Sequence, residues 1–262
     1  MARGGKPRER ALPAPLPPEQ RTVGQLVAES IRLYGAHVWK GLALGVPVVL
    51  VNALVWTGSA GNARLVVIPA SALLMPVSFV AACAIATGAP LRGRSALVAY
   101  VTGVLVFVPF PFLATVFVLP GLAWLALFGL AVPAALVEGL GLKPALARGL
   151  RLARADFVHV LGGLATLALI VFLTQAVLFF VLREYAENTQ RAAAVLASLV
   201  VSPLLFLGGA LLYVDQDARL RSRGETQRGK ERDAHVPDAV DPHREGDPDA
   251  ARESRPPPRG QP

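Results

Sequence analysis

The sequence has one cysteine, Cys83, among 262 residues, and it lies inside an apolar stretch. A single thiol cannot form a disulfide framework or a cysteine-based metal site within one chain. Charged residues are also scarce, because they make up 17% of the chain, whereas a soluble domain has about a quarter. The composition therefore excludes a disulfide scaffold and argues against a soluble domain, and Cys83 is predicted to be a small packing residue.

Charge is missing altogether from five long stretches, each bounded by charged residues. They are 41–57, 65–91, 95–137, 157–182 and 192–214. A helix needs ~20 apolar residues to cross ~30 Å of hydrocarbon, so four of the stretches predict one crossing each. The third has 43 residues, roughly 65 Å as a helix at ~1.5 Å per residue. It predicts two crossings, with a turn at Leu119, Pro120 and Gly121 because Pro-Gly breaks helices.

These stretches predict the fold class: an all-α integral membrane protein with a six-helix bundle. The predicted spans are 39–57, 65–87, 96–117, 121–137, 157–182 and 192–214. The transmembrane domain is predicted to cover 22–219. The polar, proline-rich segments 1–21 and 220–262 predict disordered tails. The first tail is not expected to be a secretory signal, because the first long apolar run comes too late.

Two amphipathic segments are predicted to lie in the membrane interface. In Glu138–His159, a helix starting at Pro144 places apolar residues on one side and three arginines, Arg148, Arg151 and Arg154, on the other. This pattern favours a helix with arginines toward lipid phosphates; a basic loop that only sets topology is the alternative. The segment Thr22–Tyr34 predicts a second such helix, which begins with a Thr22–Gln25 capping box.

The basic residues predict an orientation. Short loops on the side of Glu138–His159 hold six Lys or Arg residues, and those on the other side hold three. The positive-inside rule therefore places this hinge and both termini in the cytoplasm. The residues assigned to topology and lipid-headgroup contacts are Lys143, Arg148, Arg151, Arg154, Arg92 and Arg94. The net charge of +8 is thus attributed to anionic headgroups at the cytoplasmic face, and no nucleic-acid partner is expected.

The two amphipathic segments are similar to each other. Residues 29–38 align with 148–157 at an offset of 119, matching Arg32 with Arg151. Farther along, Pro76 and Phe79 match Pro203 and Phe206 at an offset of 127. This pattern predicts a parallel internal repeat of interface helix, span, short loop and proline-containing span. Chance similarity among apolar residues is the alternative.

Several of these motifs together resemble a bacterial membrane-protein family. They are Thr22–Leu26, Ile31–Tyr34, Val132–Gly141, Ala147–Leu152, Pro203 and Tyr213–Asp215. The sequence from about 22 to 223 resembles the membrane region attached to some glycerophosphodiester phosphodiesterases, and its free-standing relatives. The resemblance implies six membrane helices in a bacterial cell membrane. It does not imply an enzyme, because a soluble phosphodiesterase domain is not among these residues.

Residues with catalytic or ligating chemistry are few. His235 and His243 fall in the predicted tail, whereas His37 and His159 fall at membrane edges, with Glu138 and Asp156 near them in the sequence. No ligand spacing such as His-Glu-x-x-His occurs, so interfacial anchoring is favoured over a metal site. No cofactor is expected.

Three polar residues near or within the spans are singled out. Glu138 is a candidate functional acid, because acids near hydrocarbon are candidates by default; pairing with Arg148 or Arg151 is the alternative. Asn52 and Gln175 fall in equivalent spans of the repeat and are candidates for interhelical hydrogen bonds.

Three classes of function remain open from the sequence. A non-catalytic scaffold or regulatory membrane module is preferred, acting with a protein partner or a second copy of the chain. The alternative is a transporter or permease for an apolar or lipid-like solute. A lipid-modifying enzyme is least favoured, because the spans contain no nucleophile–base pair.

Overall fold

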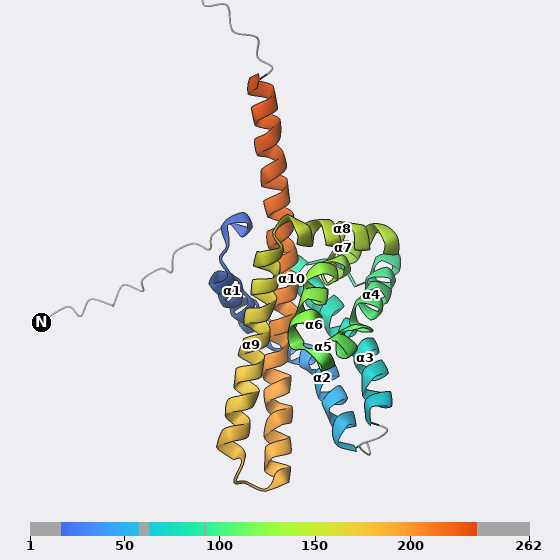
Figure 1. The fold of residues 1–262 in the computed structure, drawn as a ribbon, viewed down its shortest axis with the longest axis vertical. Helices are drawn as coiled ribbons and strands as arrows, with labels where there is room; N and C mark the ends of the chain where they lie inside the picture. Colours follow the sequence, from blue (N-terminus) through green and yellow to red (C-terminus); the bar gives the residue numbers. More distant parts are fainter. Residues whose placement is uncertain (1–16, 58–62, 92, 235–262) are drawn as a thin grey trace, which may run out of the picture. The chain divides into compact units, whose positions relative to one another are not determined.

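A computed structural model of the chain describes residues 17–57, 63–91 and 93–234 (Figure 1). Every regular element in those ranges is a helix. In chain order they are η1 (Pro18–Gln20), α1 (Val23–Ala36), α2 (Val38–Thr57), α3 (Ala63–Thr87), α4 (Gly93–Phe107), α5 (Phe110–Val116), α6 (Val118–Phe128), α7 (Ala131–Val137), α8 (Leu142–Ala155), α9 (Phe157–Leu182) and α10 (Glu187–Ala234). The chain divides into two units, residues 1–220 and 221–262, and the bundle is the first.

Five segments are long and apolar enough to cross a membrane. They are Val66–Thr87, Gly93–Leu113, Val118–Val137, Phe157–Leu182 and Glu187–Arg228. The pair α1–α2, which is bent by 107°, is a sixth if it counts as one span. The predicted all-α fold class is therefore confirmed, and these apolar helices indicate a multi-pass membrane protein.

The uncharged third stretch folds into two broken arms. One arm is α4 followed by α5, and the other is α6 followed by α7. Pro109 precedes the first turn of α5, where a missing N–H group costs no hydrogen bond. Gly129 ends α6, and a side chain there would lie 2.5 Å from the Leu125 carbonyl oxygen. The two arms confirm two candidate crossings in place of one.

The turn between the arms is not where the sequence predicts it. The connection is Phe117, whose φ of −155° and ψ of 142° are extended, and α6 begins at Val118. Leu119–Gly121 therefore lie in the first turn of α6. A proline there gives up an N–H that has no partner within the helix, so Pro120 is compatible with a helix start. In Figure 1 this connection stops well short of the level reached by the α9–α10 turn.

Helix α8 lies across the end of the bundle (Figure 1). Gly139, with φ of +65°, supplies the left-handed residue between α7 and α8. Gly149 lets the two helices approach closely, because a Cβ there would lie 2.7 Å from Ala131 Cα. The buried face of α8 is Ala145, Gly149, Leu152 and Ala153. The helix predicted here is confirmed, although it ends at Ala155 and Phe157 starts the next helix.

Helices α1 and α8 match in their limits. Each has 14 residues, and both ends of α8 lie 119 positions after those of α1. A single non-helical residue, His37 after α1 and Asp156 after α8, separates each of them from a long apolar helix. Leu26 and Ser30 are buried on α1 at the positions that Ala145 and Gly149 occupy on α8. These matches support the repeat, which stays a prediction.

The tails differ in part from the prediction of disorder. Helix α10 continues to Ala234, so residues 220–234 are helical. Extending an existing helix is far easier than nucleating one, so these residues continue the helix despite their polar composition. At the other end, Arg21 is fixed by an ion pair with Asp215. Residues 1–16 and 235–262, including His235 and His243, lie outside the described part of the chain.

Candidate functional site

The first polar cluster joins α8 to α10 and to the residue after α7. Arg148 Nε donates a hydrogen bond of 2.9 Å to Glu138 Oε1, and Arg148 Nη2 donates one of 2.6 Å to Asp217 Oδ1. The Tyr213 hydroxyl donates to Glu138 Oε1 at 2.8 Å. Glu138 therefore pairs with Arg148, as the alternative assignment of this acid predicted. Arg148 turns toward carboxylates within the protein.

The protonated form of Arg148 is secured by these neighbours. Burial alone would lower the pKa of the guanidinium, but its hydrogen bond to Glu138 and the charges of Glu138 and Asp217 raise its pKa above the ordinary value. Its side chain is 23% exposed. Lys143, Arg151, Arg154 and Arg94 are exposed and have no ion-pair partner among the described residues. Arg92 lies outside the described residues.

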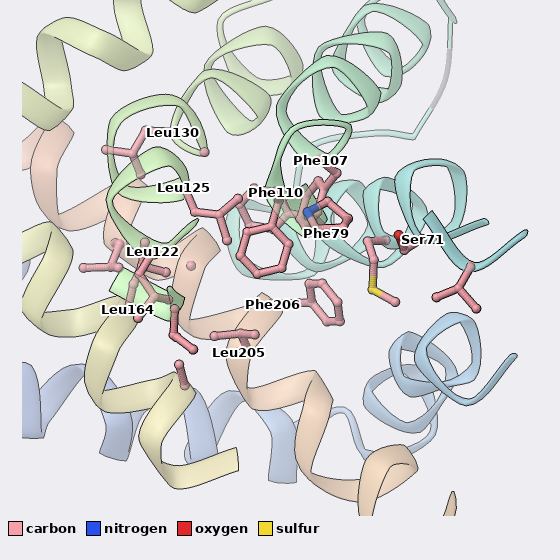
Figure 2. A pocket seen from close by; sticks show the side chains of 18 residues that line it. Ser71, Phe79, Phe107, Phe110, Leu122, Leu125, Leu130, Leu164, Leu205 and Phe206 are labelled. Atoms are coloured by element: carbon pink, nitrogen blue, oxygen red, sulfur yellow. The ribbon is translucent and has the colours of Figure 1, made fainter. Parts of the chain in front are cut away.

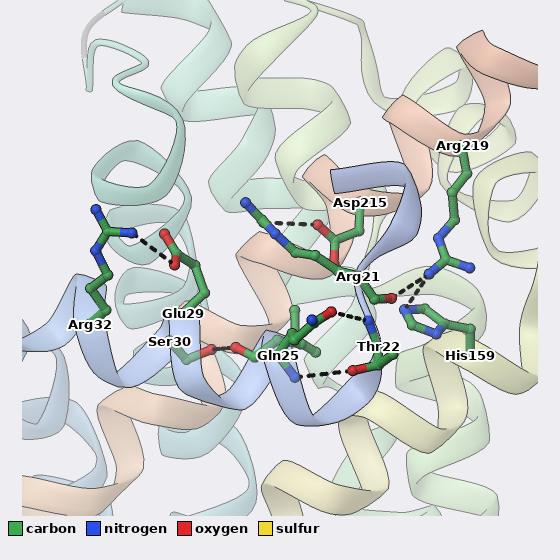
Figure 3. A network of polar contacts seen from close by, with 10 residues as sticks. Arg21, Thr22, Gln25, Glu29, Ser30, Arg32, His159, Asp215 and Arg219 are labelled. Atoms are coloured by element: carbon green, nitrogen blue, oxygen red, sulfur yellow. Dashed lines mark hydrogen bonds and ion pairs between the residues drawn. The ribbon is translucent and has the colours of Figure 1, made fainter. Parts of the chain in front are cut away.

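A second polar cluster fixes the start of α1 to α9 and α10 (Figure 3). Arg21 Nη1 donates to Asp215 Oδ1 at 3.0 Å, and the Asp215 side chain is fully buried. Arg219 donates to Asp156 Oδ2 at 2.8 Å and to the Arg21 carbonyl oxygen at 2.7 Å. His159 Nε2 lies 3.3 Å from Arg219 Nη2. The cluster also contains the predicted Thr22–Gln25 capping box, which is confirmed.

A third polar group lies within the spans, between α2, α9 and α10. Asn52 Nδ2 and Gln175 Nε2 each donate a hydrogen bond of 3.0 Å to the Ser198 hydroxyl. The prediction that these two amides bond between helices is confirmed, and both use the same oxygen. The three side chains line a hollow of about 340 Å³. Such bonds join helices where apolar surface gives little driving force for association.

The central cavity of the bundle is apolar (Figure 2). It encloses about 400 Å³, and its lining comes from α3, α4, α5, α6, α9, α10 and the break after α6. Ser71 has the one polar side chain in this lining, and its hydroxyl donates to the Ile68 carbonyl oxygen of its own helix. The lining includes Val118, which is 64% exposed at the α5–α6 connection. One edge of the cavity therefore lies at that exposed connection.

The chemistry of the lining determines what can fill this cavity. Water needs polar partners, which the lining does not offer. Hydrocarbon is the filling that suits the site.

Two phenylalanines that the predicted repeat aligns both line this cavity. Phe79 of α3 and Phe206 of α10, 127 positions apart, are both buried and both line it. Figure 2 shows the two rings reaching into the space from their separate helices. Phe79 also packs edge-on against Phe107 of α4, with ring centroids 6.2 Å apart. Both copies of the predicted repeat therefore contribute to the lining, together with α4, α5 and α6.

Several hydrogen-bond partners in these clusters leave no signal in the sequence. Ser198, Asp217, Arg219 and Arg21 were not singled out, because hydrogen-bond partners as many as 198 positions apart leave no local signal. Residues 213–215 did contribute to the family resemblance. Among the residues that the structure describes, no group of three or more His, Cys, Asp or Glu could hold a metal ion.

Fold and site together define an all-helical multi-pass membrane protein with polar clusters at its α8 end and an apolar cavity within the bundle. Comparisons with protein-family models, curated proteins and solved structures found no match to this chain. The resemblance to the membrane region of glycerophosphodiester phosphodiesterases therefore stays a prediction.

Proposed function

We propose that the chain is a non-catalytic membrane protein, a scaffold or regulatory module, whose bundle binds the hydrocarbon part of a membrane lipid in its central cavity. The observation that supports this is the apolar lining of about 400 Å³, which is more than twice the ~150 Å³ apolar cavity that holds benzene. One edge of the cavity lies at Val118, and the helix that Val118 starts is a candidate span. Within the hydrocarbon region that such a span would cross, lipid chains are the apolar material available.

The polar clusters support a structural role over a chemical one. Glu138, the candidate acid, accepts hydrogen bonds from Arg148 and Tyr213, so its carboxylate links α8 to α10. The exposed cations Lys143, Arg151 and Arg154 remain assigned to anionic headgroups. We place α8 and both termini on the cytoplasmic side of a bacterial cell membrane, following the bias of basic residues. A protein partner or second copy would dock on this face.

Photo-crosslinking tests the proposal. Purified protein in bilayers is irradiated with a phospholipid that carries a diazirine in its acyl chain, and labelled peptides are mapped by mass spectrometry. Labelling within 118–130 is expected. Ala168→Phe fills the cavity from α9 and should reduce that labelling at least fivefold. Ala176→Phe, on the same helix but outside the lining, should leave it unchanged.

Val118→Trp gives a second obstruction, at an exposed position where a large side chain has room. It should reduce the labelling even if Ala168→Phe fails to fold. Equal labelling of 118–130 in the wild type and in a folded obstructed variant would refute lipid binding in the cavity.

A permease for an apolar or lipid-like solute is the second candidate. The helix breaks favour it, because Phe110, Pro111 and Gly129 beside those breaks line the cavity, and a broken helix can move as two segments. Uptake of a fluorescent fatty acid into proteoliposomes separates the two. A scaffold gives no uptake above empty liposomes, whereas a permease gives uptake that Ala168→Phe abolishes.

A further inference from the structure

A separate groove lies between α2 and α3, near the corner where α1 meets α2. It encloses about 710 Å³. Its lining does not include any residue of the two polar clusters around Arg148 and Arg21. It shares no lining residue with the central cavity, although α3 contributes to both. The groove is thus a second candidate site, independent of the function proposed above.

The body of the groove is apolar. Leu44 of α2 and Val77, Ala81 and Ile85 of α3 line it. Ser78 also lines it, but its hydroxyl donates to the Leu44 carbonyl oxygen at 2.7 Å. That polar group is therefore already satisfied within the protein. This apolar body of the groove, which we call the trough, suits a hydrocarbon chain better than water.

The rim of the groove carries one positive charge, that of Lys40. His37 and Lys40 line it, and no Asp or Glu belongs to the lining. Within the described residues Lys40 has no ion-pair partner, whereas Arg21, Arg148 and Arg219 are each paired with a carboxylate. An unpaired ammonium beside an apolar trough attracts an anion whose remainder is apolar.

The neighbouring residues place this rim at the membrane interface. Trp39 is 85% exposed beside Lys40, and the chain turns by 107° between α1 and α2. Exposed tryptophan and lysine at the start of a span are typical of the headgroup level. The groove then runs along α2 and α3 from this level into the hydrocarbon, which is the orientation of a bilayer lipid.

We infer that the α2–α3 groove binds one anionic phospholipid, with its phosphate at Lys40 and an acyl chain between Leu44 and Ile85. A zwitterionic lipid fits the trough equally well but gains less at the rim, because it has no net negative charge to offer. The charge of Lys40 therefore provides the selectivity for an anionic lipid, and the trough provides the apolar contact area for the acyl chain.

Native mass spectrometry of the full chain tests the inference, with phosphatidylglycerol and phosphatidylcholine titrated separately. Lys40→Gln should weaken the first phosphatidylglycerol adduct about fivefold, the effect typical of one lysine near an anionic surface. It should leave phosphatidylcholine binding unchanged. Arg183→Gln removes an exposed arginine just after α9 instead, and should change neither. Ala81→Phe fills the trough and should weaken both lipids.

Two results would overturn the inference. One is equal phosphatidylglycerol affinity in the wild type and the Lys40→Gln variant. The other is an equal loss in the Arg183→Gln variant, which would show a diffuse charge effect. Inorganic phosphate at matched concentration should not displace the lipid; displacement would mean a site for a free anion and would contradict the role of the trough.

Discussion

Arg148 and Asp217 are joined by a hydrogen bond of 2.6 Å across 69 positions of the chain. The bond connects the helix across the end of the bundle to the last long helix. Arg148 also holds Glu138 at 2.9 Å, so one guanidinium serves two carboxylates. This arrangement makes Arg148 a structural residue, unlike its neighbours Arg151 and Arg154 on the exposed face of α8.

Arg148→Ala is therefore expected to destabilise the protein, because it removes the hydrogen bonds that Glu138 and Asp217 accept from the guanidinium. Hydrogen bonds to charged groups contribute ~1.5–3 kcal/mol each, so for the two bonds we expect a loss of at least roughly 3 kcal/mol and a fall of at least about 6 °C in the melting temperature. Thermal unfolding in detergent measures it. Arg151→Ala is the matched control and should shift the midpoint by less than about 2 °C. Equal shifts in the two variants would contradict the role of Arg148.

The pair of Arg21 and Asp215 gives a stricter test, because the Asp215 side chain is fully buried. Removing one partner of a buried pair leaves an uncompensated charge and costs about 3–5 kcal/mol. Arg21→Ala should therefore be strongly destabilising. The double variant Arg21→Ala with Asp215→Asn removes the stranded charge and should recover part of the loss.

Thermal unfolding of the two variants and of Asp215→Asn alone completes a double-mutant cycle. Arg32→Ala serves as the control, because its pair with Glu29 has an arginine that is 67% exposed and is worth less than about 1 kcal/mol. A coupling near zero between Arg21 and Asp215 would mean that the pair does not fasten the start of α1.

Ser198 is expected to matter more than its single hydroxyl suggests. It accepts from both Asn52 and Gln175, so Ser198→Ala breaks two interhelical bonds. Such bonds average about 0.6 kcal/mol each in membrane bundles, which predicts a loss near 1 kcal/mol. Thr174→Val is the control, because the Thr174 hydroxyl bonds to Ile170 of its own helix. A larger loss in the Thr174 variant would argue against the cluster.

Gly149 should tolerate no side chain. An added Cβ would lie 2.7 Å from Ala131 Cα, and overpacking costs about 1–3 kcal/mol. Gly149→Ala should therefore lower the unfolding midpoint. Gly162→Ala on α9 is the matched change, because an added Cβ there meets nothing within 4 Å. That variant should be neutral or stabilised by up to about 1 kcal/mol through helix propensity. The opposite order of stabilities would contradict the α7–α8 contact.

Much of the architecture could be predicted from the distribution of charge. An uncharged stretch of 43 residues is too long for one crossing, and the two arms are found there. The Thr22–Gln25 capping box could also be predicted, because its partners are three positions apart. The turn was misplaced at Leu119–Gly121 because Pro-Gly is compatible with both a turn and a helix start.

The site was predicted only where the relevant residues have a distinctive chemistry. Asn52 and Gln175 are amides in apolar spans, and they stand out for that reason. Ser198 does not, although both amides bond to it. Periodicity placed Arg148 on a polar helix face, but it cannot show that Asp217 lies opposite. The apolar cavity has no local signal, because its lining comes from several helices.

The proposed topology depends most on the two crossings of the third stretch, which place Arg94 and Arg154 on the same side of the membrane. Cysteine labelling tests this directly after Cys83→Ala removes the native thiol. Arg94→Cys, Arg154→Cys and Tyr185→Cys, all at exposed positions, are treated with a membrane-impermeant maleimide on intact cells and after permeabilisation. We predict that positions 94 and 154 react only after permeabilisation, whereas position 185 reacts on intact cells. Opposite behaviour of positions 94 and 154 would contradict this topology.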